Sequence, residues 1–243
     1  MKWTVSARRM RQYLPMFPRT ALVTGGASGI GAAIVDLLRS EGAEVESVDL
    51  ADGFDVSNPV AWEGVGAVEL ACLNAGVVTG QTDVTRLSDD AYRRILGANL
   101  DGVVFGVRRL ATVMKRGSTF VVTASLAGLV PASEDPIYTL TKHAVIGFVR
   151  SVAPQLEERG IRINAVAPGF VETPLIDTGR FTDAGFPLLQ PEAVAQAVLI
   201  AARSEGTGQV WVVQPGREPL QFRFPNVPGP RDASGAGVGA PPA

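Results

Sequence analysis

The sequence is poor in the residues that build metal centres and covalent cross-links. It contains one cysteine, Cys72, and one histidine, His143, among 243 residues. A single cysteine excludes an intramolecular disulfide, and the two residues together cannot supply a His/Cys metal cluster. Cys72 lies in the apolar stretch VELACL, which indicates a small core residue rather than a reactive thiol.

Charge of one sign and long apolar runs are also missing. The formal net charge is -2 and no dense block of Lys and Arg lies inside the domain, which argues against a nucleic acid as partner. No apolar run approaches the about 20 residues that a membrane span needs. Residues 1–18 lack the continuous apolar centre of a secretory signal. We therefore expect a cytoplasmic protein that is not bound to a membrane.

The composition is that of a folded domain, with 46% hydrophobic and 19% charged residues, and the chain is long enough for one well-buried core. We expect a flexible extension over 1–18, one domain over 19–225, and a disordered Pro/Gly/Ala-rich tail over 226–243. Within the domain, strand-like segments alternate with helical ones. This alternation predicts an α/β fold with a doubly wound parallel sheet of about seven strands.

A glycine-rich turn follows the first predicted strand, in TALVTGGASGIGAAIV. Gly25, Gly29 and Gly31 have the spacing TGxxxGxG, with Ser28 and Ile30 between them. Glycine lets the backbone turn sharply, approach a pyrophosphate and pack the next helix on the strand. N–H groups at the start of that helix then face the phosphates. The turn predicts a dinucleotide site; an ordinary helix-entry turn is the alternative.

Asp49 ends the second predicted strand. It follows Gly31 by 18 residues, close to the about 20 expected for a carboxylate that binds the adenosine ribose. A 2′-phosphate would meet this carboxylate as a like charge, and no basic residue in GGASG or at Leu50 offsets it. The sequence therefore favours NAD over NADP. A capping or surface aspartate is the alternative.

A helix is predicted over Asp135–Arg150, and it places Tyr138 and Lys142 on one face. A lysine ammonium beside a phenol favours the phenolate, so we expect the pKa of Tyr138 to fall from about 10 toward neutrality. Such a phenol donates and accepts protons at cellular pH. Ser125 ends the strand-like run GSTFVVTAS, which places its hydroxyl at the carboxyl end of a strand, where ligands of open α/β sheets bind.

Ser125, the Tyr138-x-x-x-Lys142 pair and the glycine-rich turn together resemble the short-chain dehydrogenase/reductase family, over about Arg19 to Pro225. Within this range SLAG, YTLTKHAVIGF and NAVAPGFVETP look most like the NAD-linked hydroxyprostaglandin dehydrogenases. The resemblance implies hydride exchange between a nicotinamide cofactor and a secondary alcohol or ketone. Tyr138 would be the acid/base, Ser125 would bind the reacting oxygen, and Lys142 would bind the nicotinamide ribose.

The resemblance extends to two further regions. Asn99, in a helix predicted over Ser88–Met114, matches an asparagine that sits at a helical irregularity and binds a water connected to the active-site lysine. Asp55 and Val56 match residues that end a third strand and border the adenine. The helix that follows this strand looks shortened to about one or two turns.

Two segments match the family's cofactor contacts after its fourth and sixth strands. In the first, Leu73 replaces an asparagine of the family, so the structural hydrogen bond of that asparagine is not expected. The second borders the nicotinamide. The expected cofactor residues in these segments are Asn74, Ala75, Gly76, Pro168, Gly169, Val171 and Thr173.

Apolar residues near the predicted site favour a hydrophobic secondary alcohol or ketone as substrate. The pocket candidates are Leu126, Val130, Pro131, Ile137, Phe170, Val171, Leu175 and Phe181. Asp135, three residues before Tyr138, either meets a polar substrate group or is a helix-entry acid. The two longest predicted helices have apolar faces that match the family's dimer surface, so the resemblance implies a homodimer or homotetramer.

Two other functions stay open. An NADP-dependent carbonyl reductase differs only in its cofactor and is countered by Asp49. A non-catalytic NAD-sensing protein is the second, because a fold does not fix a function; such a protein would lack Tyr138 or Lys142, and both are present.

Overall fold

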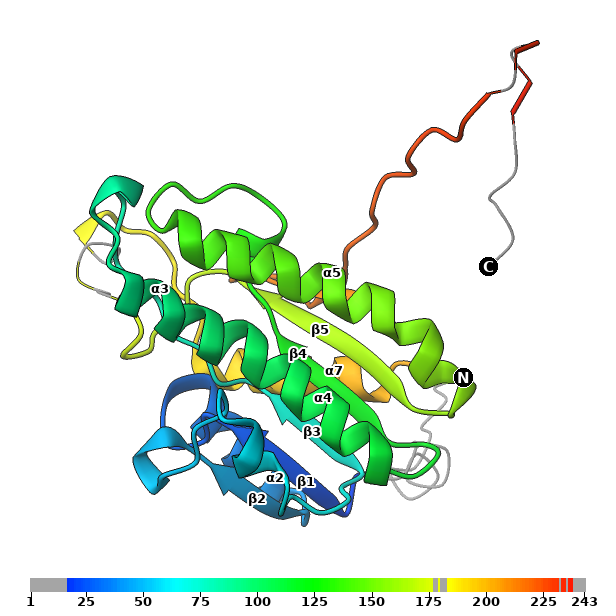
Figure 1. Ribbon diagram of the computed structural model, residues 1–243. Coiled ribbons are helices and arrows are strands. Elements are labelled where there is room, and N and C mark those ends of the chain that lie inside the picture. The colour runs from blue at the N-terminus through cyan, green and yellow to red at the C-terminus, as the bar shows by residue number, and fades with distance from the viewer. Residues whose placement is uncertain (1–16, 177–178, 180–182, 232, 235, 238–243) are drawn as a thin grey trace, which may run out of the picture.

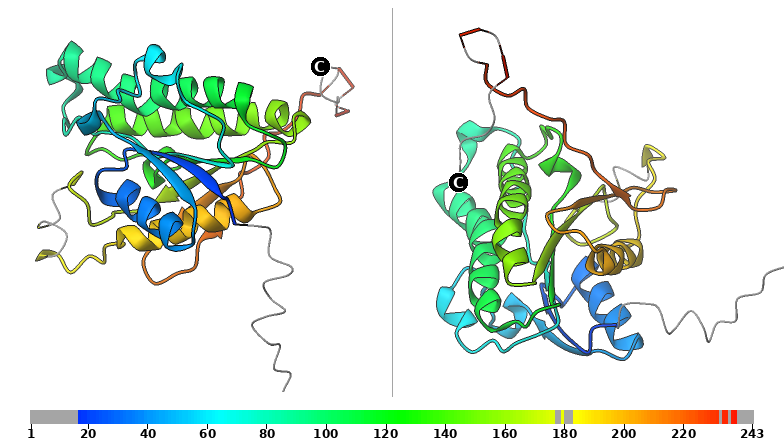
Figure 2. Two further views of the ribbon diagram at one scale, coloured as in Figure 1. Left: turned by 90° about the horizontal axis from the view of Figure 1, so that it is seen from below. Right: turned by 90° about the vertical axis from the view of Figure 1, so that its right-hand side faces the viewer.

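The computed structural model describes residues 17–176, 179, 183–231, 233–234 and 236–237. A seven-stranded sheet lies between two layers of helices (Figures 1 and 2). Its strand order is β2-β1-β3-β4-β5-β6-β7, and every pair is parallel except β6 with β7. The predicted doubly wound α/β fold is confirmed.

The strands are β1 (Thr20–Thr24), β2 (Glu44–Val48), β3 (Leu70–Leu73), β4 (Thr119–Thr123), β5 (Arg162–Pro168), β6 (Val210–Val213) and β7 (Leu220–Gln221). The α-helices are α2 (Gly29–Ser40), α3 (Asp89–Leu96), α4 (Gly102–Val113), α5 (Pro136–Glu158) and α7 (Pro191–Arg203). A π-helical turn, Gly97–Asp101, joins α3 to α4. Within the described ranges, no helix is both long and apolar enough to cross a membrane.

Both faces of the sheet are covered. Helices α4 and α5 lie over one face, and α2 and α7 lie over the other (Figure 2). Leu22 and Phe120 face the core under α4 and α5, whereas their neighbours Val23 and Val121 face the core under α2 and α7. Central strands buried on both faces are apolar throughout, which leaves the carboxyl ends of the strands as the place for polar chemistry.

The segment Asp49–Trp62 differs from the prediction. No strand ends at Asp55 and Val56; the segment forms two short 3-10 turns, Leu50–Asp52 and Pro59–Trp62. The second turn confirms the predicted shortening of the helix. A parallel crossover needs about a dozen or more residues, so the short link to β3 leaves too little chain for an additional strand. The sheet therefore ends at β2, and the antiparallel β7 completes the seven strands.

Trp62 covers the sheet where a longer helix is missing. It is 1% exposed, and its Nε1 donates a hydrogen bond to Val56 O at 2.9 Å. Its ring meets Phe54 edge to face, with centroids 5.3 Å apart. Gly106 of α4 makes this approach feasible, because a Cβ there would lie 2.7 Å from Trp62 Cη2. The Trp62 ring, packed against Gly106, thus covers the part of the core that contains Leu22 of β1.

The substitution Trp62→Phe is expected to lower the free energy of unfolding by about 2 kcal/mol, because it reduces the ring volume and leaves Val56 O without its partner. Trp211→Phe is a matched control, since the buried Nε1 of Trp211 has no hydrogen-bond partner among the described residues. Urea unfolding of both variants measures the difference. Equal losses would contradict the importance of the bond from Trp62 to Val56.

The free edge of β2 is polar. Glu44 and Glu46 are exposed and lie on the same side of the strand. On the backbone, Val45 O accepts a hydrogen bond from Arg39 Nη2 at 3.3 Å. Along this edge strand, exposed glutamates therefore alternate with less exposed residues.

Residues at both limits of the predicted domain pack on its cores. Phe17 packs against the core under α2 and α7, and the Arg203 guanidinium lies 5.2 Å from its ring centroid. Phe224 packs against the other core, with the Arg150 guanidinium 3.7 Å from its ring centroid. Residues 225–231 are exposed and lead away from the sheet (Figure 1). Residues 1–16, in the predicted extension, lie outside the described residues.

Candidate active site

Ser125, Tyr138 and Lys142 come together beyond the carboxyl end of β4. Ser125 is the N-cap of the 3-10 turn Leu126–Gly128, and its side chain hydrogen-bonds that of Tyr138. Lys142, one turn after the tyrosine on α5, places Nζ 5.5 Å from the centroid of the tyrosine ring. This amine is buried and donates a hydrogen bond to Thr123 O at 2.8 Å. The strand end and the helix together hold all three groups.

The pKa of Tyr138 is displaced in the direction opposite to the prediction. The pKa is raised to about 12: desolvation raises it most, the hydrogen bond from Ser125 lowers it, and the negative charge of Asp135 raises it further. Burial also lowers the pKa of Lys142 to about 8. The predicted fall toward neutrality is therefore wrong for the chain by itself, because it counted the lysine charge and omitted desolvation.

Asp135 is the N-cap of α5 and is 7% exposed. Its Oδ1 accepts a hydrogen bond from Tyr138 N at 2.9 Å, and its Oδ2 accepts from Thr79 N at 2.7 Å and Gly80 N at 2.9 Å. Both oxygens are thus engaged by the backbone. The contacts support the helix-entry interpretation of this acid and not a contact with substrate.

Asn99 lies in the π-helical turn, so the predicted helical irregularity is confirmed. Its side chain is 1% exposed. Oδ1 accepts from Val77 N at 2.8 Å, and Nδ2 donates to Val77 O and to Thr141 Oγ1, each at 3.0 Å. The amide therefore joins the loop after β3 to helix α5, beside the lysine.

The glycine-rich turn has the geometry that a pyrophosphate requires. Gly25 and Gly29 have positive φ values of 67° and 53°, and a Cβ on Gly31 would lie 1.8 Å from Gly25 O. Ser28 makes no side-chain cap and the first turn of α2, which includes Ile30, holds no acid. The first N–H groups of α2 are therefore left for an anionic ligand, and these residues fit a dinucleotide.

Asp49 lies beside this turn. Its Oδ2 accepts a hydrogen bond from Ala27 N and its Oδ1 accepts from Ala51 N, both at 3.1 Å. The carboxylate is therefore fastened to the glycine-rich turn as well as capping its own 3-10 turn. Each carboxylate oxygen has a second lone pair, so hydrogen bonds from a ribose can be added.

The two residues expected to border the adenine are occupied within the chain. Asp55 Oδ1 accepts from the N–H and the hydroxyl of Ser57, at 2.9 Å and 2.7 Å. Val56 is a core residue at 8% exposure, and its carbonyl accepts from Trp62. Asp55 and Val56 were expected to border the adenine because they would end a third strand. That strand is absent, so this reason for placing them at the adenine no longer holds.

Two strand-end threonines, Thr24 and Thr123, complete a network that the sequence reasoning missed. Thr24 Oγ1 accepts from Asn74 N at 2.9 Å and Ala75 N at 3.0 Å, and Thr123 Oγ1 donates to Asn74 Oδ1 at 3.0 Å. Because Thr123 O also accepts from Lys142, the network runs from the first strand to the lysine. A threonine as the last residue of two buried strands was the available signal.

Leu73, where the family pattern has asparagine, is a core residue. It is 2% exposed, and a Cβ on Gly106 would lie 2.9 Å from its Cδ2. The side chain thus joins the apolar cluster around Trp62. The hydrogen bonds of Thr24 and Asn74 tie the strand ends without an asparagine at this position.

The segment after β5 lies beside the glycine-rich turn. A Cβ on Gly29 would be 3.1 Å from Thr173 Cγ2, and a Cβ on Gly169 would be 3.4 Å from Leu126 Cδ1. Pro168 is the last residue of β5, and Val171 forms a β-bridge with Leu189.

The segment after β3 lies close to Lys142 and Asn99 at Gly76. A Cβ on Gly76 would be 3.6 Å from Lys142 Nζ and 3.2 Å from Asn99 Oδ1. A side chain at Gly76 would press on the Asn99 oxygen and touch Lys142 Nζ, so the backbone of this segment lies close to both groups.

Several apolar side chains are exposed in the segments expected to bind substrate. Val130 is 53% exposed, Phe170 43% and Leu175 40%. Phe170 meets Phe186 edge to face at a centroid distance of 5.7 Å, and sequence reasoning did not single out Phe186. Phe181 lies outside the described residues. Exposed apolar groups beyond the strand ends suit an apolar ligand.

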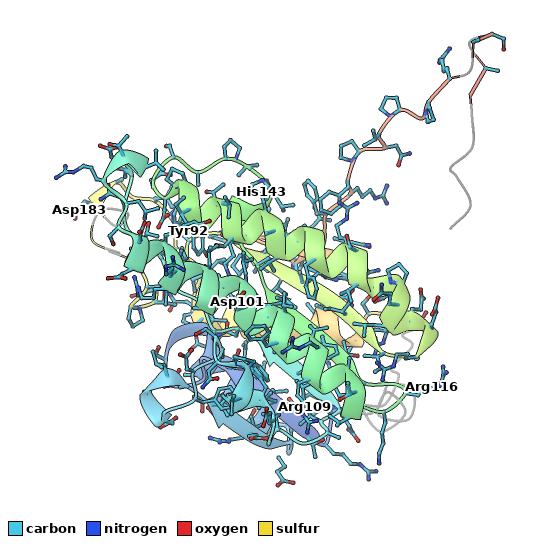
Figure 3. The ribbon with its side chains drawn as sticks, in the orientation of Figure 1. Tyr92, Asp101, Arg109, Arg116, His143 and Asp183 are labelled. Atoms are coloured by element: carbon cyan, nitrogen blue, oxygen red, sulfur yellow. The ribbon has the colours of Figure 1, made fainter. Side chains whose placement is uncertain are left out.

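His143 points away from this site. It is exposed on α5 (Figure 3), and its Nδ1 pairs with Thr139 O at 3.0 Å. Its ring is therefore hydrogen-bonded within its own helix and is not in the place of a catalytic base for this site.

The parallel sheet, the glycine-rich turn and the polar groups beyond the strand ends define a dinucleotide-binding α/β protein of the Rossmann type. A family model described as "Enoyl-(Acyl carrier protein) reductase" matches residues 56–216. The 3beta-hydroxysteroid dehydrogenase 2 of Eggerthella lenta is 32% identical, with 64% of this chain and 72% of that protein covered. The cyclohexanol dehydrogenase of an Acinetobacter species is 31% identical, with 80% and 93% covered.

A solved structure from Brucella melitensis, titled as a short-chain dehydrogenase/reductase and glucose/ribitol dehydrogenase, superposes with a TM-score of 0.72 at 26% identity. The match covers 82% of this chain and 95% of that one. The chain belongs to the short-chain dehydrogenase/reductase family, whose members are NAD(P)-dependent enzymes that act on CH–OH groups.

Proposed function

We propose that the protein is an NAD-dependent oxidoreductase that interconverts a secondary alcohol and a ketone, with Tyr138 as the acid/base. The observation that carries this proposal is the hydrogen bond between Ser125 and Tyr138, with Lys142 one helical turn away. A positioned acid/base must lie within hydrogen-bonding reach of the group that it serves. We expect the oxygen of a substrate to lie within hydrogen-bonding reach of both hydroxyls.

The chain's own residues then have separate tasks. The glycine-rich turn and Asp49 would hold the dinucleotide, and its nicotinamide would supply the acceptor for the hydride of the carbinol carbon or the donor for the ketone. Tyr138 takes the hydroxyl proton during oxidation and donates it during reduction, while the Ser125 hydroxyl stabilises the negative charge on the reacting oxygen. The hydrogen bond to Thr123 O holds the ammonium group of Lys142 where the nicotinamide ribose is expected.

The raised pKa of Tyr138, about 12, bears on the direction of proton transfer. At pH 7 the chain by itself holds the tyrosine as a neutral phenol, which is the form that donates a proton to a ketone. Alcohol oxidation requires the phenol to lose its proton first. We therefore expect the rate of oxidation to rise with pH more steeply than the rate of reduction.

The choice of NAD over NADP rests on acids around the ribose position. Asp49 lies against the glycine-rich turn through Ala27 N, and Asp52 and Asp55 follow it in the sequence. Neither 24–31 nor 47–58 contains a lysine or arginine. A 2′-phosphate would thus meet negative charge that nothing on the same segments neutralises. An NADP-dependent carbonyl reductase is the alternative.

Thermal unfolding with NAD, NADH, NADP and NADPH tests this choice. A ligand at 100 times its Kd adds about 2.7 kcal/mol, so we expect clear stabilisation by NAD and NADH and little by the phosphorylated forms. Asp49→Ser should reduce the discrimination, whereas Asp52→Ser, in the same exposed turn, should preserve it. Preference for NADP and NADPH would overturn the choice. No response to any of the four would favour a protein without catalytic use of NAD.

The substrate class that we propose is an alicyclic secondary alcohol or the corresponding ketone. The relatives named for hydroxysteroid and cyclohexanol substrates support it, and so do the exposed apolar side chains of Val130, Phe170 and Leu175. Formation of NADH from cyclohexanol and from a hydroxysteroid is the direct assay. The finer likeness to hydroxyprostaglandin dehydrogenases stays a prediction; turnover of a hydroxyprostaglandin in preference to the cyclic alcohols would support it.

We also propose a homodimer or homotetramer formed through the face of α4 and α5. Val104 and Leu140 are 37% and 48% exposed on this face, and Phe105 and Phe148 are partly buried there. Apolar groups on adjoining helices favour burial against a partner. Sedimentation of a monomer at micromolar concentration would contradict the proposal.

A further inference from the structure

One carboxylate connects two segments that are far apart in the chain. Asp135 Oδ1 accepts from Tyr138 N, the third residue of α5, at 2.9 Å. Its Oδ2 accepts from Thr79 N and Gly80 N at 2.7 Å and 2.9 Å, across sequence separations of 56 and 55 residues. A helix cap needs only the first of these bonds. The other two fasten a loop onto the start of the catalytic helix.

The fastened loop borders the active site. It begins at Gly76, beside Lys142 Nζ, and continues to Val77, whose N–H and carbonyl both pair with the Asn99 amide. Val78 O then accepts from Arg94 Nη2 at 3.0 Å. Gly80, where Asp135 binds, turns the chain with φ 67°. Asp135 is therefore the last of three side-chain contacts that hold this loop.

The charge of Asp135 also acts on the site. Its carboxylate is nearly buried, and three N–H donors together with the N-terminus of α5 stabilise the negative charge. The groups that face Tyr138 are Asp135 from the N-cap, Lys142 from the next turn of α5, and the neutral Ser125 from the turn after β4. Arg94, on α3, is directed at Val78 O. Asp135 is thus the acidic member of this set, and it opposes the phenolate.

We propose that Asp135 is a positioning residue of the active site: it clamps the loop at Thr79 and Gly80 to the start of α5, fixes Tyr138 relative to the loop that borders Lys142, and places a negative charge that opposes the phenolate. This inference rests on the proposed function, in which Tyr138 transfers the proton. It assigns to the acid a role in the reaction without contact with substrate.

Two substitutions test the clamp and the charge, each through its own measurement. Asp135→Ser keeps a helix cap, because a serine hydroxyl can accept from Tyr138 N, but it is too short to hold the loop as well. Asp135→Asn keeps the size, removes the charge and keeps one of the two acceptor oxygens, so its amide can still accept from either the cap or the loop. Asp83→Asn is the matched control, since Asp83 is an exposed aspartate that caps the short turn Val84–Arg86.

The first measurement is amide hydrogen exchange, which does not depend on turnover. In Asp135→Ser, exchange at Thr79 and Gly80 should accelerate by about tenfold or more, while exchange at Tyr138 changes by less than about twofold. The kcat should fall by about tenfold, with a smaller change in KM, because the tyrosine is less well placed. Unchanged exchange at the two loop amides would overturn the clamp.

The second measurement is the pH dependence of kcat/KM. Removing the negative charge in Asp135→Asn should lower the apparent pKa of the tyrosine by about half a unit to one unit, whereas Asp83→Asn leaves the profile in place. A cap with only a structural role would not move this profile, so an unchanged pKa in Asp135→Asn would remove the electrostatic part of the proposal. Normal turnover in Tyr138→Phe would instead overturn the proposed function. The hydrogen-exchange test of the clamp would remain valid in that case, because it does not depend on turnover.

Discussion

Replacement of Tyr138 by phenylalanine is expected to reduce kcat for an alicyclic secondary alcohol by about 10³-fold, in line with the contribution of a positioned acid/base. The phenylalanine keeps the aromatic ring at this position of α5 and loses only the hydroxyl that hydrogen-bonds with Ser125. The NADH formed in a steady-state assay measures the loss. Thermal stabilisation by NAD should persist, because the glycine-rich turn and Asp49 are untouched.

Tyr92→Phe provides the matched control for this result. Tyr92 is a tyrosine on α3 with 39% of its surface exposed, and it lies on the outer side of the helical layer (Figure 3). Its substitution should leave kcat within about twofold, as is usual for surface changes away from a site. Turnover near the original rate in Tyr138→Phe would show that another group moves the proton.

Substitution of Gly31 by alanine should be the most damaging single-methyl change in the nucleotide site. A Cβ there would lie 1.8 Å from Gly25 O and 2.8 Å from Asn74 Nδ2. The first of these is a backbone atom, so the turn must open to admit the methyl group. We expect a loss of about 3 kcal/mol of stability and a fall in Tm of about 6–12 °C. Stabilisation by NAD should disappear with the geometry of the turn.

Gly66→Ala controls for the methyl group itself. A Cβ on Gly66 would meet nothing within 4 Å, and the residue does not have a positive φ. This variant should keep its Tm and its response to NAD, measured in the same thermal scans. If Gly31→Ala bound NAD as tightly as the original protein, NAD binding would not depend on the close approach of α2 to the first strand.

The parts of the site that lie on regular elements were predictable from the sequence. Tyr138 and Lys142 are one turn apart on a helix whose apolar positions and acidic entry residue mark its start, and α5 begins at Pro136 directly after the cap. Ser125 follows a fully buried strand, so the rule for carboxyl ends of strands located it. Local periodicity fixed these positions because helix and strand geometry carry it across several residues.

The parts that depend on contacts across the fold were not predictable. The direction of the pKa shift of Tyr138 depends on how much water surrounds the hydroxyl, and no pattern in the sequence reports that. Asp135 could be placed at a helix entry, yet its bonds to Thr79 and Gly80 join residues 56 and 55 positions away. The family pattern predicted a strand ending at Asp55 and Val56. This strand is absent, because the chain between Asp49 and β3 is too short to hold it.

The sheet's termination at β2 has a consequence for the behaviour of the protein at high concentration. An open strand edge offers unpaired backbone groups to a strand of another molecule, and such pairing begins many aggregates. Here Glu44 and Glu46 crowd that edge with negative charge, and Arg39 covers one of its carbonyls. Two copies that approach by this edge repel each other at neutral pH. The glutamates thus oppose the growth of the sheet from one molecule into the next.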